Sequence, residues 1–458
     1  MRTFRIVRLK NISHSNVLKN IFLFISLTKV FFGFHTFGFI IPESERPEQF
    51  FPQLHEALLG LEENSPILLS YEFDIEEASA NHTVSLAEKG VRVGISLYGN
   101  SIHEDRPGEN FYHRYRTFNQ IYFRKPLYHW GAIHAQSEIA NLNKQKVKKD
   151  FIYRKRNLEG DTRASFLKLV TLNYRIELVR KQLKIAKENL SNIEQRASLG
   201  LSTNLSLEEA RIELLRIEIH LSELSTEKKK QENQFVRLTG YEEKLSFLSM
   251  SDFWMFCLNH NFQKEYPTLI GGLSNTELNS LKTLLEIEGN RLKIADAELK
   301  PKLNLMGSFF QDQVDVAASE GAIDRNNFVV GVEANWLLWD SHKSSAQKKA
   351  VLARKRKIEQ SIEQKNREIR EFIDGLVQEL RALEERIYLG RDLITLAEGR
   401  MDKSKLEFEM DRISSKDYLS AQMSLDQAKL ANLESICRYL SLLDHYEKAV
   451  GSPELGEL

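Results

Sequence analysis

Proline is scarce in this sequence, and two long stretches lack it altogether. Only nine of the 458 residues are proline, and none lies within 127–266 or 302–452. Proline inside a helix costs about 3 kcal/mol because it removes a backbone donor and clashes with the preceding turn. Both stretches are also rich in Leu, Ile, Ala, Glu, Lys and Arg. The missing prolines therefore predict two regions of long helix.

Cysteine, net charge and catalytic motifs are equally sparse. Cys257 and Cys437 are too few for a disulfide framework or a cysteine-based metal site, and we expect two buried free thiols, with one disulfide as the alternative. The 64 basic residues balance the 64 acidic ones, so no overall positive charge points to a nucleic-acid partner. No P-loop, H-E-x-x-H or G-x-S-x-G motif occurs. We therefore expect no enzyme, no catalytic residue, no cofactor, no bound metal and no nucleic-acid partner.

Long apolar runs are absent except at the N-terminus. Five basic residues precede the apolar segment 21–41, a pattern typical of an export signal or a membrane anchor. Lys29 interrupts the segment and no clear cleavage site follows, so a removed signal, a retained anchor and a buried core helix all remain open. No later stretch could form a membrane helix, so any second membrane would have to be crossed by strands.

Heptad spacing organises the first proline-free stretch. Two rows of apolar residues recur every seven positions and form an a/d seam typical of coiled coils: Leu169, Ile176, Leu183, Leu190 and Ala197, and Leu172, Val179, Ala186 and Ile193. Gly200 suits a left-handed helix end, and Ser202, Thr203 or Asn204 can cap the next helix. The sequence predicts a helical hairpin about 105 Å long, with Gly160 as the candidate break.

The hairpin pattern occurs twice. Five landmarks recur with a constant offset of 211 residues, which indicates a tandem duplication: Gly200 with Asp411, Ala210 with Ala421, Gly240 with Gly451, Tyr128 with Trp339, and Ala135-Gln136 with Ala346-Gln347.

Each half also contains a predicted pair of strands of about ten residues. Apolar and polar residues alternate within 91–98, 111–125, 302–309 and 328–336. Arg114, Arg116 and Arg124 share the polar face of the second segment. Alternation alone favours a soluble sheet, whereas the export-like N-terminus favours a barrel in lipid, apolar outside. Four strands cannot close a barrel, so three copies would be needed for twelve.

Several segments in order resemble the TolC-like outer membrane efflux proteins over about residues 50–452. They are "ENSP" (63–66), "LKPKLNL" (299–305), "NWLLWDSHKSSAQ" (335–347), "EMDRISSKDYLSAQ" (409–422), and the helix ends "RLTG" and "KAVG". The resemblance implies a homotrimer with a twelve-stranded barrel in outer-membrane lipid and a helical tunnel across the periplasm. It also implies a periplasmic adaptor and an inner-membrane pump as partners.

The resemblance further implies which residues form the periplasmic tips and mouth. Asp417 would line a constricted, cation-favouring gate, although the same residue suits the first turn of a helix. Ser420 stands where some members have a second acidic residue, and Asp411 replaces the usual tip glycine. Arg412 would pair with a neighbouring hairpin or simply be solvated. Gly200, Thr203 and Asn204 would form the other tip, and the three arginines named above would face the barrel lumen.

The sequence thus predicts a mainly α protein with β: tandem helical hairpins plus four membrane strands per protomer of a trimeric barrel. Its expected parts are a signal or anchor (1–41), a first repeat (42–240, strands 90–126, hairpin 130–238), an inter-repeat segment (241–272), a second repeat (273–451, strands 302–339, hairpin 342–449) and a tail (452–458). The predicted function is the exit duct of a tripartite efflux or type I secretion system, with drug, metal or protein cargo open. The alternative is a periplasmic coiled-coil adaptor or scaffold without a barrel.

Overall fold

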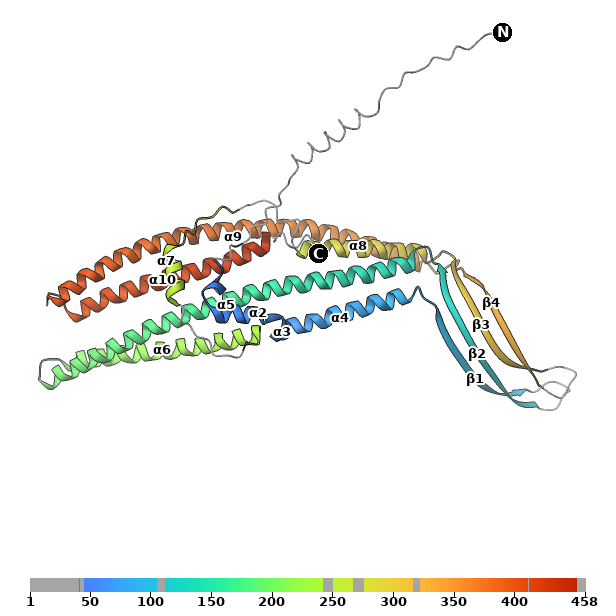
Figure 1. Cartoon of the computed structure of the whole chain (residues 1–458), viewed down its shortest axis with the longest axis horizontal. Coiled ribbons are helices and arrows are strands. Elements are labelled where there is room, and N and C mark those ends of the chain that lie inside the picture. The colour runs from blue at the N-terminus through green and yellow to red at the C-terminus, as the bar shows by residue number, and fades with distance from the viewer. Residues whose placement is uncertain are drawn as a thin grey trace, which may run out of the picture.

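The computed structural model describes residues 41, 45–104, 112–241, 250–266, 276–315, 322–410 and 412–450. The predicted signal or anchor therefore lies outside the described residues except for Ile41, as does the predicted tail. The described chain is elongated, with one β-sheet at one end and two helical hairpins reaching toward the other (Figure 1).

Two long helical hairpins dominate the fold, as predicted. The first consists of α5 (Ala132–Ser198) and α6 (Asn204–Thr239), and the second of α9 (Lys343–Glu409) and α10 (Ser415–Val450). The helices have 67 and 36 residues in each hairpin, and every bound in the second hairpin lies 211 residues after its counterpart. The offset found from scattered landmarks in the sequence therefore extends along the full length of both helices.

The junctions between strand and helix repeat as well. Trp130 and Ser341 both have φ of 54°, and the next residues, Gly131 and His342, have φ of 79° and 68°. Three of these four residues are not glycine, and such residues adopt positive φ only at a cost. The same tight reversal is thus kept in both halves, at the point where the chain leaves the sheet and starts a long helix.

Gly160 does not interrupt α5, so the suggestion of a break there was wrong. The helix is continuous, and Gly160 is buried against α10. A Cβ atom at this position would lie 2.0 Å from Asp444 Oδ2 and 1.8 Å from Lys448 Nζ. The residue is small because a charged pair of α10 lies against it, and packing on both sides maintains the helix.

The sheet is antiparallel, with strand order β1-β2-β3-β4. Its strands are β1 (Arg92–Glu104), β2 (Tyr112–Tyr128), β3 (Lys302–Asp315) and β4 (Ala322–Asn335). They have 13 to 17 residues, longer than the predicted ten, because ladder pairing continues through polar residues that were taken as loop, such as Ser101 opposite Tyr115. Backbone pairing does not require the alternation of side chains from which the strands were first inferred.

Shorter elements complete the chain. They are η2 (Pro47–Gln49), α2 (Pro52–Leu59), α3 (Leu61–Asn64), α4 (Pro66–Ala87), α7 (Met250–Asn259) and α8 (Thr276–Ala297). Beside the sheet the helices form a layer in the order α4, α5, α8, α9, and farther away the order is α6, α5, α10, α9 (Figure 1).

The largest core lies in the middle of the molecule, where residues distant in sequence meet. Phe51, Phe166 and Phe253 come from the N-terminal segment, α5 and α7, and all three are buried, with the ring of Phe51 5.0 Å from Phe166 and 5.2 Å from Phe253. Cys257 and Cys437 are buried in the same core as free thiols, and burial raises the pKa of both. This core joins the two hairpins.

Polar contacts fix the inter-repeat segment onto the second hairpin. Arg391 of α9 donates to the carbonyl oxygens of Cys257 at 2.7 Å and His260 at 2.6 Å, at the C-terminal end of α7, and its desolvation lowers the pKa of the guanidinium. Tyr266 donates to Glu384, whose burial raises the pKa of the carboxyl group. The two Arg391 contacts satisfy carbonyl groups that the end of α7 leaves free.

Replacing Phe253 by alanine is expected to lower the free energy of unfolding by about 3–5 kcal/mol, since a fully buried ring would leave a cavity. Met255→Ala is the matched control, because Met255 lies on the same helix and is 58% exposed. Chemical denaturation of the purified protein in detergent measures both. Equal effects of the two substitutions would contradict a structural role for the Phe253 ring.

Candidate functional site

The two hairpin turns lie at the end of the molecule remote from the sheet (Figure 1). In the first, Gly200 has φ of 72° and Leu201 N donates to Arg196 O at 2.8 Å. In the second, Arg412 N donates to Glu407 O at 2.8 Å. Each bond spans five residues and closes the helix end in the manner of a Schellman motif. Asp411, at the position equivalent to Gly200, lies outside the described residues.

Each returning helix is capped by a hydroxyl group. Thr203 Oγ1 accepts from Ser206 N at 3.3 Å, so Thr203 is the cap of α6, and Asn204 is the first residue of that helix. Ser414 caps α10: its Oγ accepts from Asp417 N at 3.2 Å and donates to Asp417 Oδ2 at 2.6 Å. Such a cap satisfies a helix donor that would otherwise lack a partner.

The position of Asp417 is thus compatible with a purely structural role in the first turn of α10. It is exposed, lies in the first turn of α10, and its carboxylate is oriented by the Ser414 hydroxyl at the positive end of the helix. Ser420 is one turn farther along α10 and is also exposed. The helix thus brings these two residues to one face near the tip, with Arg412 exposed just before it.

Sequence reasoning missed two supports of this tip. Ser414 forms an S-x-x-D capping pattern with Asp417, a signal that was present in the sequence. The rings of Phe408 and Tyr418 stack at 5.1 Å and 13° across the turn. Their pairing depends on how the hairpin closes, so spacing alone did not predict it.

Apolar side chains surround the first tip and remain exposed in the single chain. Leu199, Leu201 and Leu205 are 72%, 67% and 65% exposed. Apolar groups gathered in this way at a tip are typical of a contact surface.

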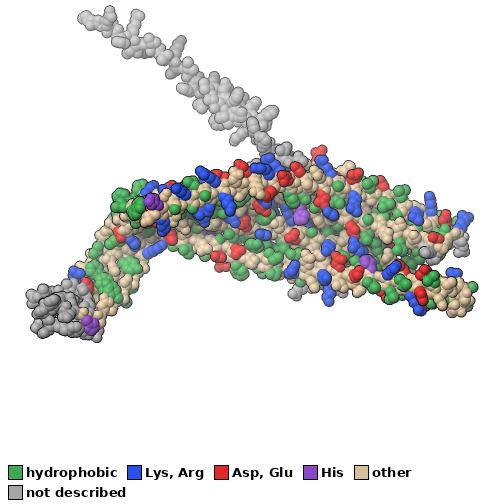
Figure 2. All heavy atoms as spheres, turned by 180° about the vertical axis from the view of Figure 1, so that it is seen from behind, with side chains coloured by type: hydrophobic (Ala, Val, Ile, Leu, Met, Phe, Trp, Pro, Cys, Tyr) green, Lys and Arg blue, Asp and Glu red, His purple; other side chains and the backbone are tan. Residues whose placement is uncertain are grey.

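The sheet has one apolar face, which is also exposed. Ile95, Ile121, Phe309 and Phe328 are register partners in one row across all four strands. Phe328 is 74% exposed and Ile95 65%. Figure 2 shows hydrophobic side chains gathered over the sheet and at its junction with the helices. In water such a face would be unfavourable.

The opposite face carries polar groups and a row of aromatic rings. Arg124 forms an ion pair with Glu333 across the sheet. Arg114 and Arg116 occupy register positions of the same parity as Arg124 on β2, and their side chains lie outside the described residues. Tyr98 stacks on Phe118 at 4.8 Å, an aromatic contact that sequence reasoning did not predict.

Tryptophans mark the boundary between sheet and helices. Trp130 Nε1 donates to Pro301 O at 2.9 Å and Trp336 Nε1 donates to Leu299 O at 3.0 Å. Trp336 and Trp339 are 63% and 66% exposed. Amphipathic rings of this kind concentrate where apolar and aqueous surroundings meet.

None of the helices described combines the length and apolarity needed to span a membrane. Within the same residues, no group of three or more His, Cys, Asp or Glu is arranged to hold a metal ion.

Comparison with known proteins adds the family. Residues 59–241 match the family model described as outer membrane efflux protein. This segment is similar to the outer membrane efflux proteins. The match confirms the resemblance inferred from the sequence, and the family's members are channels. No curated protein matches the chain.

Solved structures share the fold over nearly the whole chain. CusC is similar with a TM-score of 0.72 at 15% identity, covering 91% of this chain and 96% of its own. The outer membrane protein VceC of Vibrio cholerae gives 0.70 at 16%, covering 90% and 99%. The CmeC outer membrane channel of Campylobacter jejuni gives 0.73 at 14%, covering 88% and 87%. The predicted fold, tandem helical hairpins with four strands, is therefore confirmed.

Substituting Ser414 by alanine is expected to destabilise the first turn of α10 by about 1 kcal/mol, since Asp417 N would lose its acceptor. Amide hydrogen exchange in this turn should then be about fivefold faster, because about 1 kcal/mol corresponds to a factor of about five in the opening equilibrium. Ser414→Thr keeps the acceptor and should preserve the protection. Equal exchange in the alanine variant and the original chain would show that the cap contributes nothing.

Proposed function

We propose that this protein is the outer-membrane exit duct of a tripartite efflux or type I secretion system. Three copies form a twelve-stranded barrel in the outer membrane, and their helices form a tunnel through the periplasm. Cargo passes passively, supplied by an inner-membrane pump through a periplasmic adaptor. The observation that carries the proposal is the sheet, which exposes an apolar face on four strands of membrane-spanning length.

The sheet supports a trimer through its edges. Among the described residues, β1 and β4 each have a neighbouring strand on one side only. Lipid provides no hydrogen-bond partners for a bare strand edge, and small membrane barrels begin at about eight strands. Closing the sheet on further copies satisfies the edges of β1 and β4 together, and three copies give the twelve strands expected from the family resemblance.

The helices support the tunnel through their length. Each 67-residue helix extends about 100 Å. The tips then lie far from the membrane, where Gly200, Thr203 and Asn204 of one hairpin and Arg412 of the other meet the adaptor. The proposed parts of the chain remain a leading segment (1–41), two repeats (42–240 and 273–451), the segment between them (241–272) and a tail (452–458).

We assign the mouth of the tunnel to the second tip. Asp417 from three copies forms a ring of carboxylates that favours cations. Ser420 leaves this ring single, and Asp411 and Arg412 form the turn beside it. At the other end, Arg114, Arg116 and Arg124 face the lumen on the polar side of the sheet. Nothing in these groups selects among drug, metal and protein cargo. The pump determines which of these is exported.

Membrane fractionation followed by native mass measurement in detergent tests the assembly. We expect a trimer in the outer-membrane fraction. A protein that stays monomeric and water-soluble once residues 1–41 are removed would instead support the adaptor or scaffold, whose sheet would be covered by protein.

Ion selectivity in planar bilayers tests the mouth. Asp417→Asn should reduce the preference for K⁺ over Cl⁻, measured as the reversal potential in a KCl gradient, because it removes three charges from the constriction. Ser420→Asp should increase the preference by adding a second ring. Asp392→Asn, an exposed change on α9 away from the tip, is the control. An unchanged reversal potential in both tip variants would show that Asp417 acts only as a partner of the Ser414 cap.

A further inference from the structure

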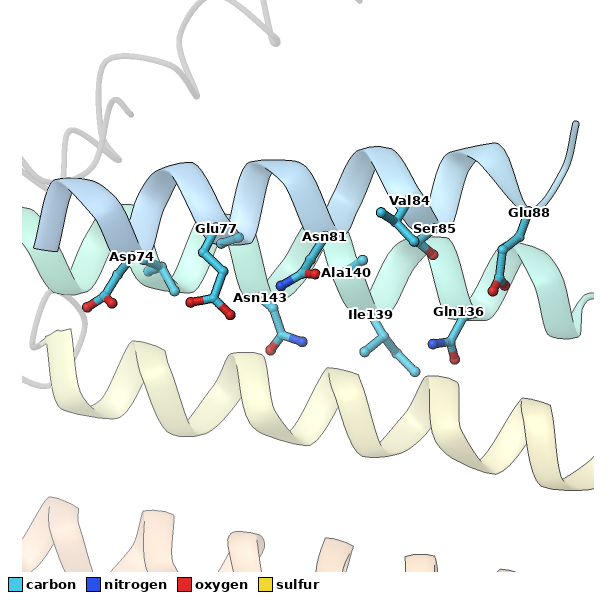
Figure 3. Close-up of a pocket in the computed structure, with 12 residues that line it drawn as sticks. Asp74, Glu77, Asn81, Val84, Ser85, Glu88, Gln136, Ile139, Ala140 and Asn143 are labelled. Carbon is cyan, nitrogen blue, oxygen red and sulfur yellow. The ribbon is translucent and has the colours of Figure 1, made fainter.

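The helical layer beside the sheet has two outer edges of opposite charge. Its neighbours in order are α4, α5, α8 and α9, as Figure 3 also shows. α4 leads into β1 and α9 follows β4, so each outer helix lies under one edge strand of the sheet. A copy that continues the sheet head to tail, with its β4 beside β1, therefore places its own α9 near α4.

The α4 edge is acidic. Residues 66–87 contain four acids and no lysine or arginine. The acids are Glu72, Asp74, Glu76 and Glu77, and none of them forms an ion pair with another described residue. Figure 3 shows Asp74, Glu77 and Glu88 along a groove between α4 and α5. Phe73 lies beside these acids and is 69% exposed.

The α9 edge is basic. Residues 343–357 contain seven lysines and arginines and no acid. Two of them are used within the chain: Lys348 Nζ lies 2.7 Å from Asp296 Oδ1 and Arg354 Nε 3.0 Å from Glu288 Oε2, both on α8. The other five form no ion pair with a described residue: Lys343, Lys349, Lys355, Arg356 and Lys357.

The free cations of α9 include a stripe that faces away from α8. Ser344 and Val351 are buried on the side toward α8. At 100° per residue, Lys349 and Arg356 lie on the opposite side of the helix, with the exposed Leu352 between them. This outer stripe thus has two cations around an apolar side chain, as the α4 edge has acids around Phe73.

The two stripes overlap in their distance from the sheet at Glu76 and Arg356. Glu76 is eleven residues before the end of α4 at Ala87, and Arg356 is thirteen residues after the start of α9 at Lys343. At 1.5 Å per residue these separations are about 17 and 20 Å along the helices. Two copies joined through β1 and β4 would therefore bring Glu76 and Arg356 to about the same level.

We propose that α4 of one copy docks against α9 of the next through this acidic-to-basic seam. The inference rests on the proposed trimer and adds what sets its direction. Two α4 edges, or two α9 edges, would place like charges opposite each other, which disfavours a two-fold pair. Unlike edges attract, and repetition of the same head-to-tail contact closes a ring. The seam selects the ring over the two-fold dimer.

Charge exchange within the full-length protein tests the seam. One variant reverses α4 (Glu72→Lys with Glu76→Lys), a second reverses α9 (Lys349→Glu with Arg356→Glu), and a third carries all four changes. Each of the first two should raise the concentration at which half the chains are trimeric by at least about tenfold at low salt. The third restores opposite charges at every seam and should recover the original value.

The control is Arg180→Glu with Lys181→Glu, which changes the net charge as the α9 variant does but lies on α5 between its neighbours. It should leave the trimer unchanged. Reversals that do not weaken the trimer, or a four-fold variant that fails to recover it, would overturn the seam while leaving the proposed function intact. An original protein that is not trimeric in detergent would overturn both.

Discussion

The unpaired backbone edges of β1 and β4 are the constraint on which the rest of the structure depends. Within the part of the chain that the structure describes, the four-stranded sheet has neither a closed ladder nor a cover for its apolar face. In the proposed trimer, closure by further copies would satisfy the strand edges, and lipid would cover the apolar face. Both solutions require the edges of the helical layer to fit as well, because α4 and α9 are joined to the edge strands. The charge of a helix surface is thereby tied to the pairing of a strand.

The central core has the complementary task of holding the two hairpins of one chain together. Its strongest contacts come from segments outside the duplicated helices: Phe51 and Phe253 pack around Phe166, and Arg391 binds the end of α7. The duplicated hairpins alone do not fix their orientation relative to each other. The short segments before and between the hairpins fix this orientation through the contacts named above. These segments are not duplicated, and they join the two repeats into one structure.

Much of the fold follows from local signals in the sequence. The proline-free stretches and the 211-residue offset predicted the hairpins because proline and glycine act locally, and the offset agrees with the helix bounds throughout. Strand ends were missed because pairing at Ser101 depends on the partner strand rather than on its own side chain. The break predicted at Gly160 was wrong for the same reason. Gly160 leaves room for the side chain of Asp444, which lies nearly three hundred residues away in the sequence. At the tip, the capping role of Ser414 could have been predicted from the sequence. The stacking of Tyr418 on Phe408 could not, because it depends on how the turn closes.

The two tips show how duplication can produce both equivalence and difference. Thr203 and Ser206 stand at the positions of Ser414 and Asp417, and in both tips a hydroxyl caps the second helix by accepting the same backbone donor. The fold of the turn therefore does not require an acid at the third helical position, since serine serves in the first tip. Capping of the second helix does not need the carboxylate of Asp417. An acid at this position occurs in only one of the two tips of each chain. Three copies would then place three charges, rather than six, around the axis, which suits a single selective ring better than a uniformly acidic rim.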